Sequence, residues 1–200
     1  MVEVNATRRR FLVASTAVVA GAGVVGVAIP FLGSWKPSAK AKAAGAPVKY
    51  DLAKLQPGDM VTVEWRGKPV YVVRRTREIL DSLAKNKDLV RDPESEEPQQ
   101  PDYAKNATRS IQEEYLVVVG LCTHLGCAPK GRFQPGVNPA TGGEDSGWPG
   151  GFFCPCHGSK FDLAGRVFKG VPAPTNLVVP PHRFDNTILI IGEEGGQQNA

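Results

Sequence analysis

Hydrophobic and polar positions divide the chain into two unlike parts. From Phe11 to Leu32 every residue is uncharged, and most are Val, Ala or Gly. At about 1.5 Å per residue, a helix of this length crosses the hydrocarbon core of a bilayer. We therefore predict one transmembrane helix and assign residues 11–35 to a membrane anchor.

Short apolar runs beyond residue 47 have the length and composition of β-strands. Met60–Trp65 and Pro69–Val73 flank Arg66–Lys68, which predicts a hairpin turn. Tyr115–Leu121 is typical of a buried strand, and Thr187–Ile191 predicts another strand near the C-terminus. These runs favour antiparallel sheets.

Other segments are predicted to be a helix or loops. Apolar residues recur on one face of a predicted helix at Thr76–Lys85. Asp92–Asp102 is acidic and proline-rich, so we expect a surface loop, and Ala128–Gly151 is expected to be a connecting loop without regular structure. The predicted fold class is all-β: an antiparallel β-sandwich head over 48–200, with a small inserted lobe over about 122–169, preceded by one N-terminal transmembrane helix.

The net charge of +4 is unevenly distributed along the chain. Residues 1–46 hold six Lys or Arg and one Glu, so the head itself is slightly acidic. The positive charge therefore belongs to the membrane-proximal part. We expect no nucleic-acid partner, because such proteins gather their basic residues on the folded domain.

The segment before the apolar stretch resembles a twin-arginine export signal, Thr7–Leu12 (TRRRFL). Such signals address folded proteins for export. This predicts a protein of the bacterial inner membrane, with residues 1–10 in the cytoplasm and the head on the periplasmic side. Alternatively, the arginines simply hold the N-terminus inside. Ala39–Ala41 offers a signal-peptidase site, but the apolar stretch exceeds a typical signal core, so we predict a retained anchor.

Residues 36–47 are rich in Ala and Lys, contain one Gly and lack apolar periodicity. Such a composition is typical of a tether, and we predict a flexible hinge. A passive spacer is the alternative.

All four cysteines and two of the three histidines lie in two short boxes, Cys122–Cys127 (CTHLGC) and Cys154–Ser159 (CPCHGS). Two thiolates and two imidazoles are the ligand set of a Rieske [2Fe–2S] cluster. A tetrahedral zinc site is the alternative. If Cys122, His124, Cys154 and His157 are the ligands, Cys127 and Cys156 remain, one in each box. A disulfide between them would indicate an oxidising compartment, whereas a pair of buried free thiols is the other possibility.

The boxes resemble those of the Rieske iron–sulfur subunit of bacterial ubiquinol–cytochrome c reductases. The resemblance extends from the anchor to Gly170–Pro174 (GVPAP), which is nearly the whole chain. It implies a disulfide between Cys127 and Cys156. It also implies that one [2Fe–2S] cluster is bound by four residues: Cys122, His124, Cys154 and His157.

The resemblance also implies a function. In this family the subunit oxidises ubiquinol at the cytochrome b subunit and passes the electron to a c-type cytochrome subunit, coupled to proton release in respiration. The subunit is thus part of a proton-translocating oxidoreductase, a dimeric complex in contact with membrane lipid. His157 would accept a hydrogen bond from the quinol and couple electron and proton transfer, with a similar electronic role for His124.

Residues around the boxes match further family features. Leu125 would shield the cluster at the tip of the lobe, and Ser159 matches a serine whose hydroxyl bonds a bridging sulfide. Phe161 stands where well-known relatives have a tyrosine that bonds a ligand sulfur, which predicts a lower reduction potential. Pro172 and Pro174 match a proline loop that covers the cluster, with a plain surface turn as the alternative.

Two glycines of the boxes and the third histidine also have expected roles. Gly126 and Gly158 would allow close loop packing or a positive φ, or they are ordinary turn glycines. His182 lies beside two prolines and is predicted to be structural.

Rival functions need residues that this chain lacks or leave its other features unexplained. A Rieske oxygenase needs a second iron site of two histidines and a carboxylate, but only His182 remains. A zinc-stabilised, membrane-tethered binding module is a third class. A plastoquinol-oxidising relative would usually carry different residues after the second box.

Overall fold

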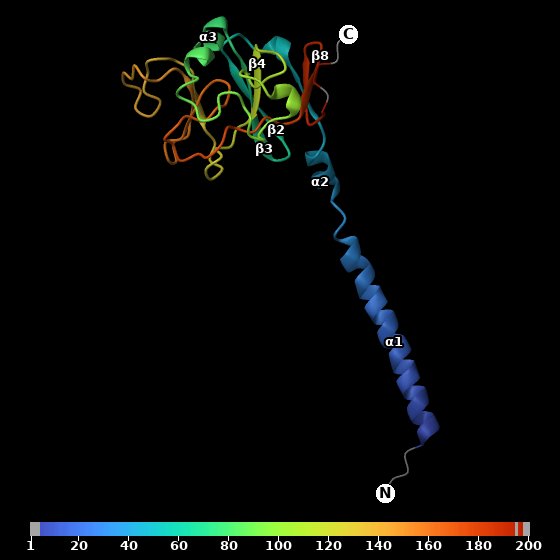
Figure 1. Ribbon diagram of the computed structural model, residues 1–200. Helices are drawn as coiled ribbons and strands as arrows, with labels where there is room; N and C mark the ends of the chain where they lie inside the picture. The colour runs from blue at the N-terminus through green and yellow to red at the C-terminus, as the bar shows by residue number, and fades with distance from the viewer. Residues whose placement is uncertain (1–4, 195, 198–200) are drawn as a thin grey trace. The chain divides into compact units, whose positions relative to one another are not determined.

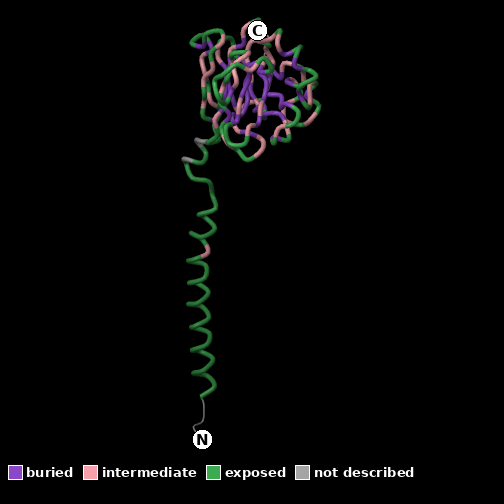
Figure 2. Tube along the Cα trace, turned by 90° about the vertical axis from the view of Figure 1, so that its left-hand side faces the viewer, coloured by how far each residue is buried: buried purple, intermediate pink, exposed green. Residues whose placement is uncertain are grey.

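The computed structural model describes residues 5–194 and 196–197 and consists of two compact units, residues 1–43 and 44–200. The first is helical and the second is built of strands (Figure 1). Figure 2 shows that buried residues gather in the second unit, whereas nearly all described residues of the first are exposed.

The first unit consists mainly of helix α1, Ala6–Gly33. It is long and apolar enough to cross a membrane. It begins five residues before the predicted anchor, because the Asn5 side chain accepts hydrogen bonds from the Thr7 and Arg8 amides at 3.1 and 3.2 Å and arginine favours helices. A short helix α2, Ala39–Ala44, lies within the predicted hinge. Alanine-rich sequence favours this turn of helix, but six residues are marginal without other support.

The second unit contains three sheets, with strand orders β1-β9-β8-β10, β2-β3-β4 and β5-β6-β7. All neighbours are antiparallel except β10 and β8. The strands are β1 Val48–Asp51, β2 Met60–Trp65, β3 Lys68–Arg74, β4 Tyr115–Val119, β5 Lys130–Arg132, β6 Gly151–Phe153, β7 Lys160–Phe161, β8 His182–Asp185, β9 Ile188–Ile191 and β10 Gly196–Gln197.

The predicted hairpin forms between β2 and β3. Arg66 and Gly67 both have positive φ, 51° and 69°, as a type I′ turn requires. Lys68 belongs to β3 rather than to the turn. This tight turn holds Val63 opposite Val70, so the register of the hairpin is set locally.

Strand β3 lies between two hydrophobic cores. Val70 and Val72 pack with the β1-β9-β8 sheet, while Tyr71 and Val73 pack with the lobe that holds the two cysteine boxes. Successive strand side chains point to opposite faces. The unbroken apolar run in β3 therefore serves two cores, and the predicted sandwich with an inserted lobe is confirmed.

Helix α3, Arg77–Lys85, confirms the predicted helix, and Thr76 caps it by accepting a hydrogen bond from the Ile79 amide at 3.4 Å. Strand β4 ends two residues earlier than predicted, at Val119. Beyond it, Gly120 packs directly on the Tyr71 ring, where a larger residue would collide. Strand β9 begins one residue after Thr187.

Two loop predictions need correction. Residues 92–102 are largely irregular but are not simply a surface loop, because Ser95 is fully buried and Pro93 accepts a hydrogen bond from Arg166. Residues 128–151 contain β5 and the start of β6. The composition of this segment, rich in Gly and Pro, did not indicate these strands. Strand β5 is only three residues long and depends on pairing with β6.

Candidate metal centre

The two cysteine boxes form loops with the same backbone hydrogen bonds. In each loop the amide of the first cysteine donates to the carbonyl of the sixth residue, and the amide of the fifth residue donates back to the first cysteine. The four N···O distances are 2.7 Å (Cys122 to Cys127), 2.9 Å (Gly126 to Cys122), 2.8 Å (Cys154 to Ser159) and 3.0 Å (Gly158 to Cys154). Both loops therefore present their side chains from an equivalent scaffold.

The fifth residue of each loop has to be a glycine for conformational reasons. Gly126 and Gly158 have φ of 80° and 77°, in the left-handed region that other residues rarely adopt. A Cβ added to either would meet no atom within 4 Å. The positive-φ alternative is thus correct for both, and close packing is not the reason.

The first cysteine of each loop is buried. The first loop follows β4 and the second joins β6 to β7. Cys122 and Cys154 are 3% and 2% exposed and carry free thiols. Burial raises the pKa of the Cys122 thiol, whereas metal coordination would deprotonate it. These two sulfurs therefore lie at the inner side of the site.

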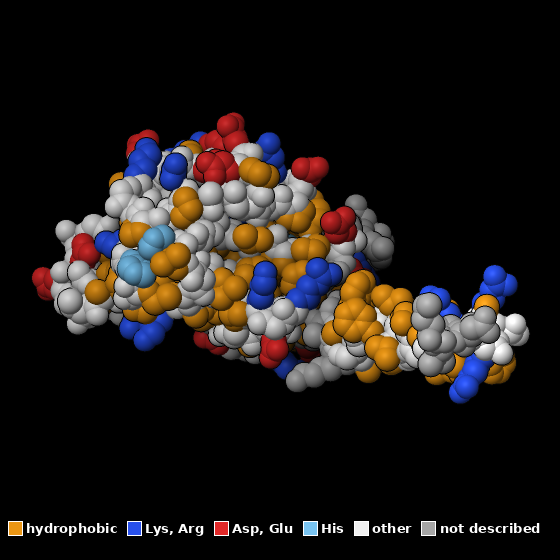
Figure 3. All heavy atoms as spheres, turned by 90° about the horizontal axis from the view of Figure 1, so that it is seen from below, with side chains coloured by type: hydrophobic (Ala, Val, Ile, Leu, Met, Phe, Trp, Pro, Cys, Tyr) orange, Lys and Arg blue, Asp and Glu red, His pale blue; other side chains and the backbone are white. Residues whose placement is uncertain are grey.

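The two box histidines lie at the outer side. The rings of His124 and His157 are 4.8 Å apart between centroids and nearly perpendicular. His157 is exposed and His124 is half-buried, and the Nδ1 atom of His124 is buried without a hydrogen-bond partner. Figure 3 shows histidine side chains together on the surface beside hydrophobic side chains.

A disulfide joins the two loops. Cys127 and Cys156 are bonded, with Cα atoms 6.7 Å apart and a sequence separation of 29. Their sulfurs and that of Cys154 all lie within 4.8 Å of one another. The predicted pairing is confirmed, and the alternative of two buried free thiols is wrong.

A third segment, residues 170–175, contacts both loops. The Ser159 hydroxyl accepts a hydrogen bond from the Ala173 amide at 3.0 Å, and the Thr123 hydroxyl donates to the Thr175 carbonyl at 2.7 Å. Ser159 still has its own hydroxyl proton to donate. Thr123 was not singled out from the sequence, since a threonine between two predicted ligands has no pattern of its own.

The exposed tip and the core beneath the loops are both apolar. Leu125 is 71% exposed, whereas Phe161 is fully buried in the core that contains Cys122 and Cys154. Pro172 and Pro174 are both exposed. The Pro174 carbonyl accepts a hydrogen bond from Arg91 at 2.9 Å.

His182 lies within the strands and is fully buried. Its Nδ1 atom is 2.8 Å from the Pro180 carbonyl, and its ring meets Tyr103 edge-on. Burial lowers the pKa of His182 to about 4, so it is neutral at physiological pH. This is the structural role that the sequence predicted.

The donor set fits a Rieske cluster. Two buried thiols and two adjacent imidazoles supply the two kinds of ligand that this cluster divides between its irons. The unpartnered Nδ1 of His124 is costly to bury unless it has a ligand. Ligand type alone would also suit zinc, so the comparison with known proteins decides.

Two models of known protein families together match nearly the whole chain. The family model described as the Rieske [2Fe-2S] domain matches residues 47–181. A second model, described as the ubiquitinol-cytochrome C reductase Fe-S subunit TAT signal, matches residues 2–38 and confirms the predicted twin-arginine signal. These matches favour iron–sulfur over zinc.

Curated relatives match at the level of the whole protein. The ubiquinol-cytochrome c reductase iron-sulfur subunit of Allochromatium vinosum is 57% identical, over 96% of this chain and 92% of the relative. The subunit of the same name from Blastochloris viridis is 46% identical, over 94% of each chain. Among solved structures, a chain of a hyperthermophilic respiratory complex III covers 88% of this chain and 97% of its own length, with 23% identity and a TM-score of 0.47. The chain therefore belongs to the family of ubiquinol–cytochrome c reductase iron–sulfur subunits, and its cofactor is a Rieske [2Fe–2S] cluster.

Proposed function

We propose that this protein takes electrons one at a time from ubiquinol at a cytochrome b subunit and passes them to a c-type cytochrome subunit. The observation that carries the proposal is the pair of imidazoles at the surface, one of them exposed, in front of two buried thiols. An electron-transfer subunit needs this order, because its redox group must be shielded from water yet reach a substrate through a ligand. The names of the relatives support the same reaction.

We propose Cys122 and Cys154 as ligands of one iron and His124 and His157 as ligands of the other. When bound, the cluster supplies one-electron redox chemistry. The disulfide between Cys127 and Cys156 holds the loops together, so that the four ligand side chains stay converged. The Ser159 hydroxyl is oriented by the Ala173 amide and retains a proton that can stabilise added negative charge.

His157 is the proposed contact with substrate. Its exposed ring can accept a hydrogen bond from the ubiquinol hydroxyl and take up that proton as the electron leaves. Leu125, also exposed, would cover the contact and exclude water. His124 is more buried, so its role is electronic rather than a direct contact with ubiquinol.

Redox-titrated EPR of the purified complex, with and without a quinol-site inhibitor, tests this contact. An inhibitor that occupies the site should shift the cluster signal, because it replaces the hydrogen bond to His157. An unchanged signal, in a sample whose ubiquinol oxidation is blocked, would contradict the proposal.

A variant pair gives an independent test of the same surface. Leu125→Ala should keep the EPR signal but lower kcat/KM for ubiquinol at least about tenfold, since burying a leucine side chain contributes ~1.5–3 kcal/mol and each ~1.36 kcal/mol is a factor of ten. Val178→Ala is the matched control, because Val178 is also an exposed apolar residue. Its carbonyl accepts a hydrogen bond from the Val119 amide on β4 rather than from either loop. Equal losses in the two variants would argue against a docking role for Leu125.

We further propose a single-pass topology in a bacterial inner membrane. Residues 1–10 would be cytoplasmic, 11–35 the anchor, 36–47 a hinge and 48–200 a periplasmic head. The apolar helix and the twin-arginine match support this arrangement. Protease added to spheroplasts should release the head, and protease added to inside-out vesicles should not; the reverse result would overturn the orientation.

The complex is proposed to be a dimer embedded in lipid, with ubiquinol oxidation coupled to proton release. In this arrangement the hinge lets the head reach both partner subunits. Replacing residues 36–47 with one continuous, rigid helical segment should slow cytochrome c reduction while leaving the cluster signal intact. Unchanged turnover would identify residues 36–47 as a passive spacer instead.

A further inference from the structure

Every charged side chain that is fully buried, among the residues that the structure describes, belongs to one region. The set comprises three arginines and one aspartate: Arg75, Arg109, Asp162 and Arg166. Each is at most 2% exposed. The region therefore carries more positive than negative charge, shielded from solvent.

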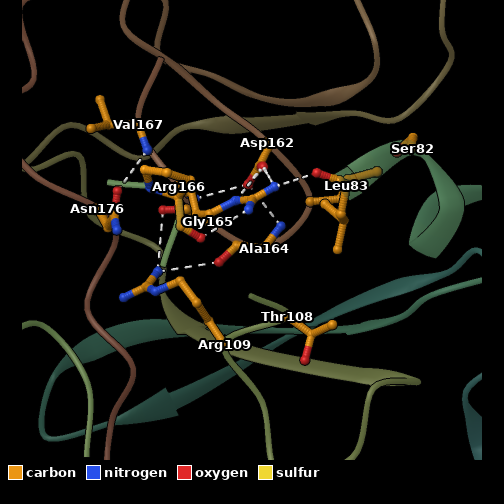
Figure 4. A network of polar contacts seen from close by, with 12 residues as sticks. Ser82, Leu83, Thr108, Arg109, Asp162, Ala164, Gly165, Arg166, Val167 and Asn176 are labelled. Atoms are coloured by element: carbon orange, nitrogen blue, oxygen red, sulfur yellow. Dashed lines mark hydrogen bonds and ion pairs between the residues drawn. The ribbon is translucent and has the colours of Figure 1, made fainter. Parts of the chain in front are cut away.

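Asp162 is the one carboxylate of this group. Its Oδ1 atom accepts hydrogen bonds from the amides of Ala164 and Arg166, both at 2.9 Å. Its Oδ2 atom accepts from the Arg166 guanidinium at 2.7 and 2.8 Å (Figure 4). Asp162 thus pairs with Arg166, and among the described residues no carboxylate forms an ion pair with Arg75 or Arg109. Glu113 acts on Arg75, and Asp92 on Arg109, only through space.

The two remaining arginines are hydrogen-bonded chiefly to neutral groups. Arg75 donates to the carbonyls of Glu113, Thr108 and Leu163 and to the Ser110 hydroxyl, at 2.7–3.0 Å. Arg109 donates to the carbonyls of Ala164, Gly165 and Leu177 and to the Gln100 side chain, at 2.7–3.3 Å. Carbonyl groups stabilise a buried cation but do not cancel its charge.

Both guanidiniums remain charged at physiological pH. Burial lowers the pKa of Arg75 and of Arg109 to about 10. Neither group loses its proton near pH 7. The positive excess is therefore permanent under working conditions.

This charge lies close to the metal centre. Ser159, whose carbonyl is bonded to the Cys154 amide, precedes Asp162 by three residues, a span of at most about 10 Å. Leu163, Ala164 and Leu177, which supply carbonyls to the arginines, share one hydrophobic core with Cys122 and Cys154. Apolar side chains rather than water therefore fill the intervening space, and Coulomb interactions there are weakly screened.

We propose that Arg75 and Arg109 are tuning residues, whose buried positive excess stabilises the reduced cluster and raises its reduction potential. One-electron reduction adds a negative charge, which nearby uncompensated cations favour. The inference rests on the proposed ligation by Cys122 and Cys154. It gives this arginine network a redox role in addition to its hydrogen bonding.

The sign of the potential change tests the proposal. In the purified complex, Arg75→Gln or Arg109→Gln should lower the potential measured by EPR-monitored redox titration, whereas Asp162→Asn should raise it. The double variant Asp162→Asn/Arg166→Gln removes one charge of each sign and should leave the potential close to that of the parent. A merely structural role would instead shift the single and double variants in the same direction.

Further readouts separate this inference from the proposed function. An intact cluster EPR signal reports ligation, and its response to a quinol-site inhibitor reports substrate contact, whatever the potential does. If Asp162→Asn fails to fold, the sign can still be tested by comparing the reduction potential of Arg75→Gln or Arg109→Gln with that of the double variant. Arg183→Gln is the control expected to leave the potential unchanged, because Arg183 on β8 forms a partly exposed ion pair with Glu193. Equal potentials for Arg75→Gln, Arg109→Gln and the parent would overturn the proposal.

Discussion

The two cores on either face of β3 differ in chemistry. The core toward β1, β8 and β9 is lined by apolar side chains such as Val70, Leu189 and Ile191. The core toward the metal centre contains free thiols and adjoins buried arginines and an aspartate. The first core only has to exclude water, whereas the second also has to hold irregular loops. Loops leave backbone carbonyls unpaired, and buried guanidiniums supply the missing donors.

The largest expected effect comes from removing the buried carboxylate of Asp162, which lies next to the core of the metal centre. Asp162→Ala leaves the Arg166 guanidinium buried without its ion pair, so we expect a loss of roughly 3–5 kcal/mol in the free energy of unfolding. Denaturant unfolding of the full chain in detergent, followed by circular dichroism, measures it. A loss below about 1 kcal/mol, the scale of a single hydrogen bond, would show that the network is not essential to stability.

Leu189→Ala is the matched change in the apolar core. Deleting a fully buried leucine typically costs roughly 2–5 kcal/mol. The stability loss should therefore resemble that of Asp162→Ala, but the cluster potential should stay unchanged. A shifted potential in Leu189→Ala would mean that the two cores are not electrostatically distinct.

The disulfide should matter next. Replacing both Cys127 and Cys156 with Ser opens a loop closed over a separation of 29 residues, and chain entropy predicts a loss of about 3–4 kcal/mol. We expect the cluster EPR signal to disappear at a lower temperature during stepwise heating. If parent protein and variant lose the EPR signal at the same temperature, the disulfide is not needed to hold the two loops together.

Acid should weaken the fold through His182. Its folded-state pKa of about 4 lies below its ordinary value of 6.5, so protons bind the unfolded chain more tightly. Stability is then fully present above pH 6.5 and is lost as pH falls toward 4, by about 3 kcal/mol at most. His182→Gln should flatten this part of a pH–stability curve, and an equally steep curve in that variant would assign the acid sensitivity to other groups.

Phe161→Tyr should have the smallest effect. A new hydroxyl that bonds a ligand sulfur would stabilise the reduced cluster by about 1 kcal/mol, roughly 40 mV for one electron. Redox titration should show a higher potential than that of the parent, with Phe152→Tyr as a control in the same core. An unchanged or lower potential would contradict the role assigned to position 161.

Local patterns were enough for strands β2, β3, β4 and β9 and for helices α1 and α3, but not for the other strands. The β2–β3 hairpin and α3 follow from alternation, turn residues and a capping threonine, all of which act within a few residues. The strands in 130–132 and 151–153 could not be predicted, because each is stabilised by pairing with a distant segment. Buried Arg75 and Arg109 also gave no signal, since arginine is mostly exposed and its partners lie 33–88 and 9–68 residues away.

By itself the sequence determined the chemical groups of this protein: an apolar anchor, an export signal and two cysteine–histidine boxes that supply two thiolate and two imidazole ligands for a metal centre. Only the tertiary structure decided which side chains face inward. It buries the thiols of Cys122 and Cys154, exposes His157 and surrounds Asp162 with arginines. The physical reason is that ligand type is a property of single residues, whereas burial and electrostatic environment arise from contacts between segments far apart in the chain.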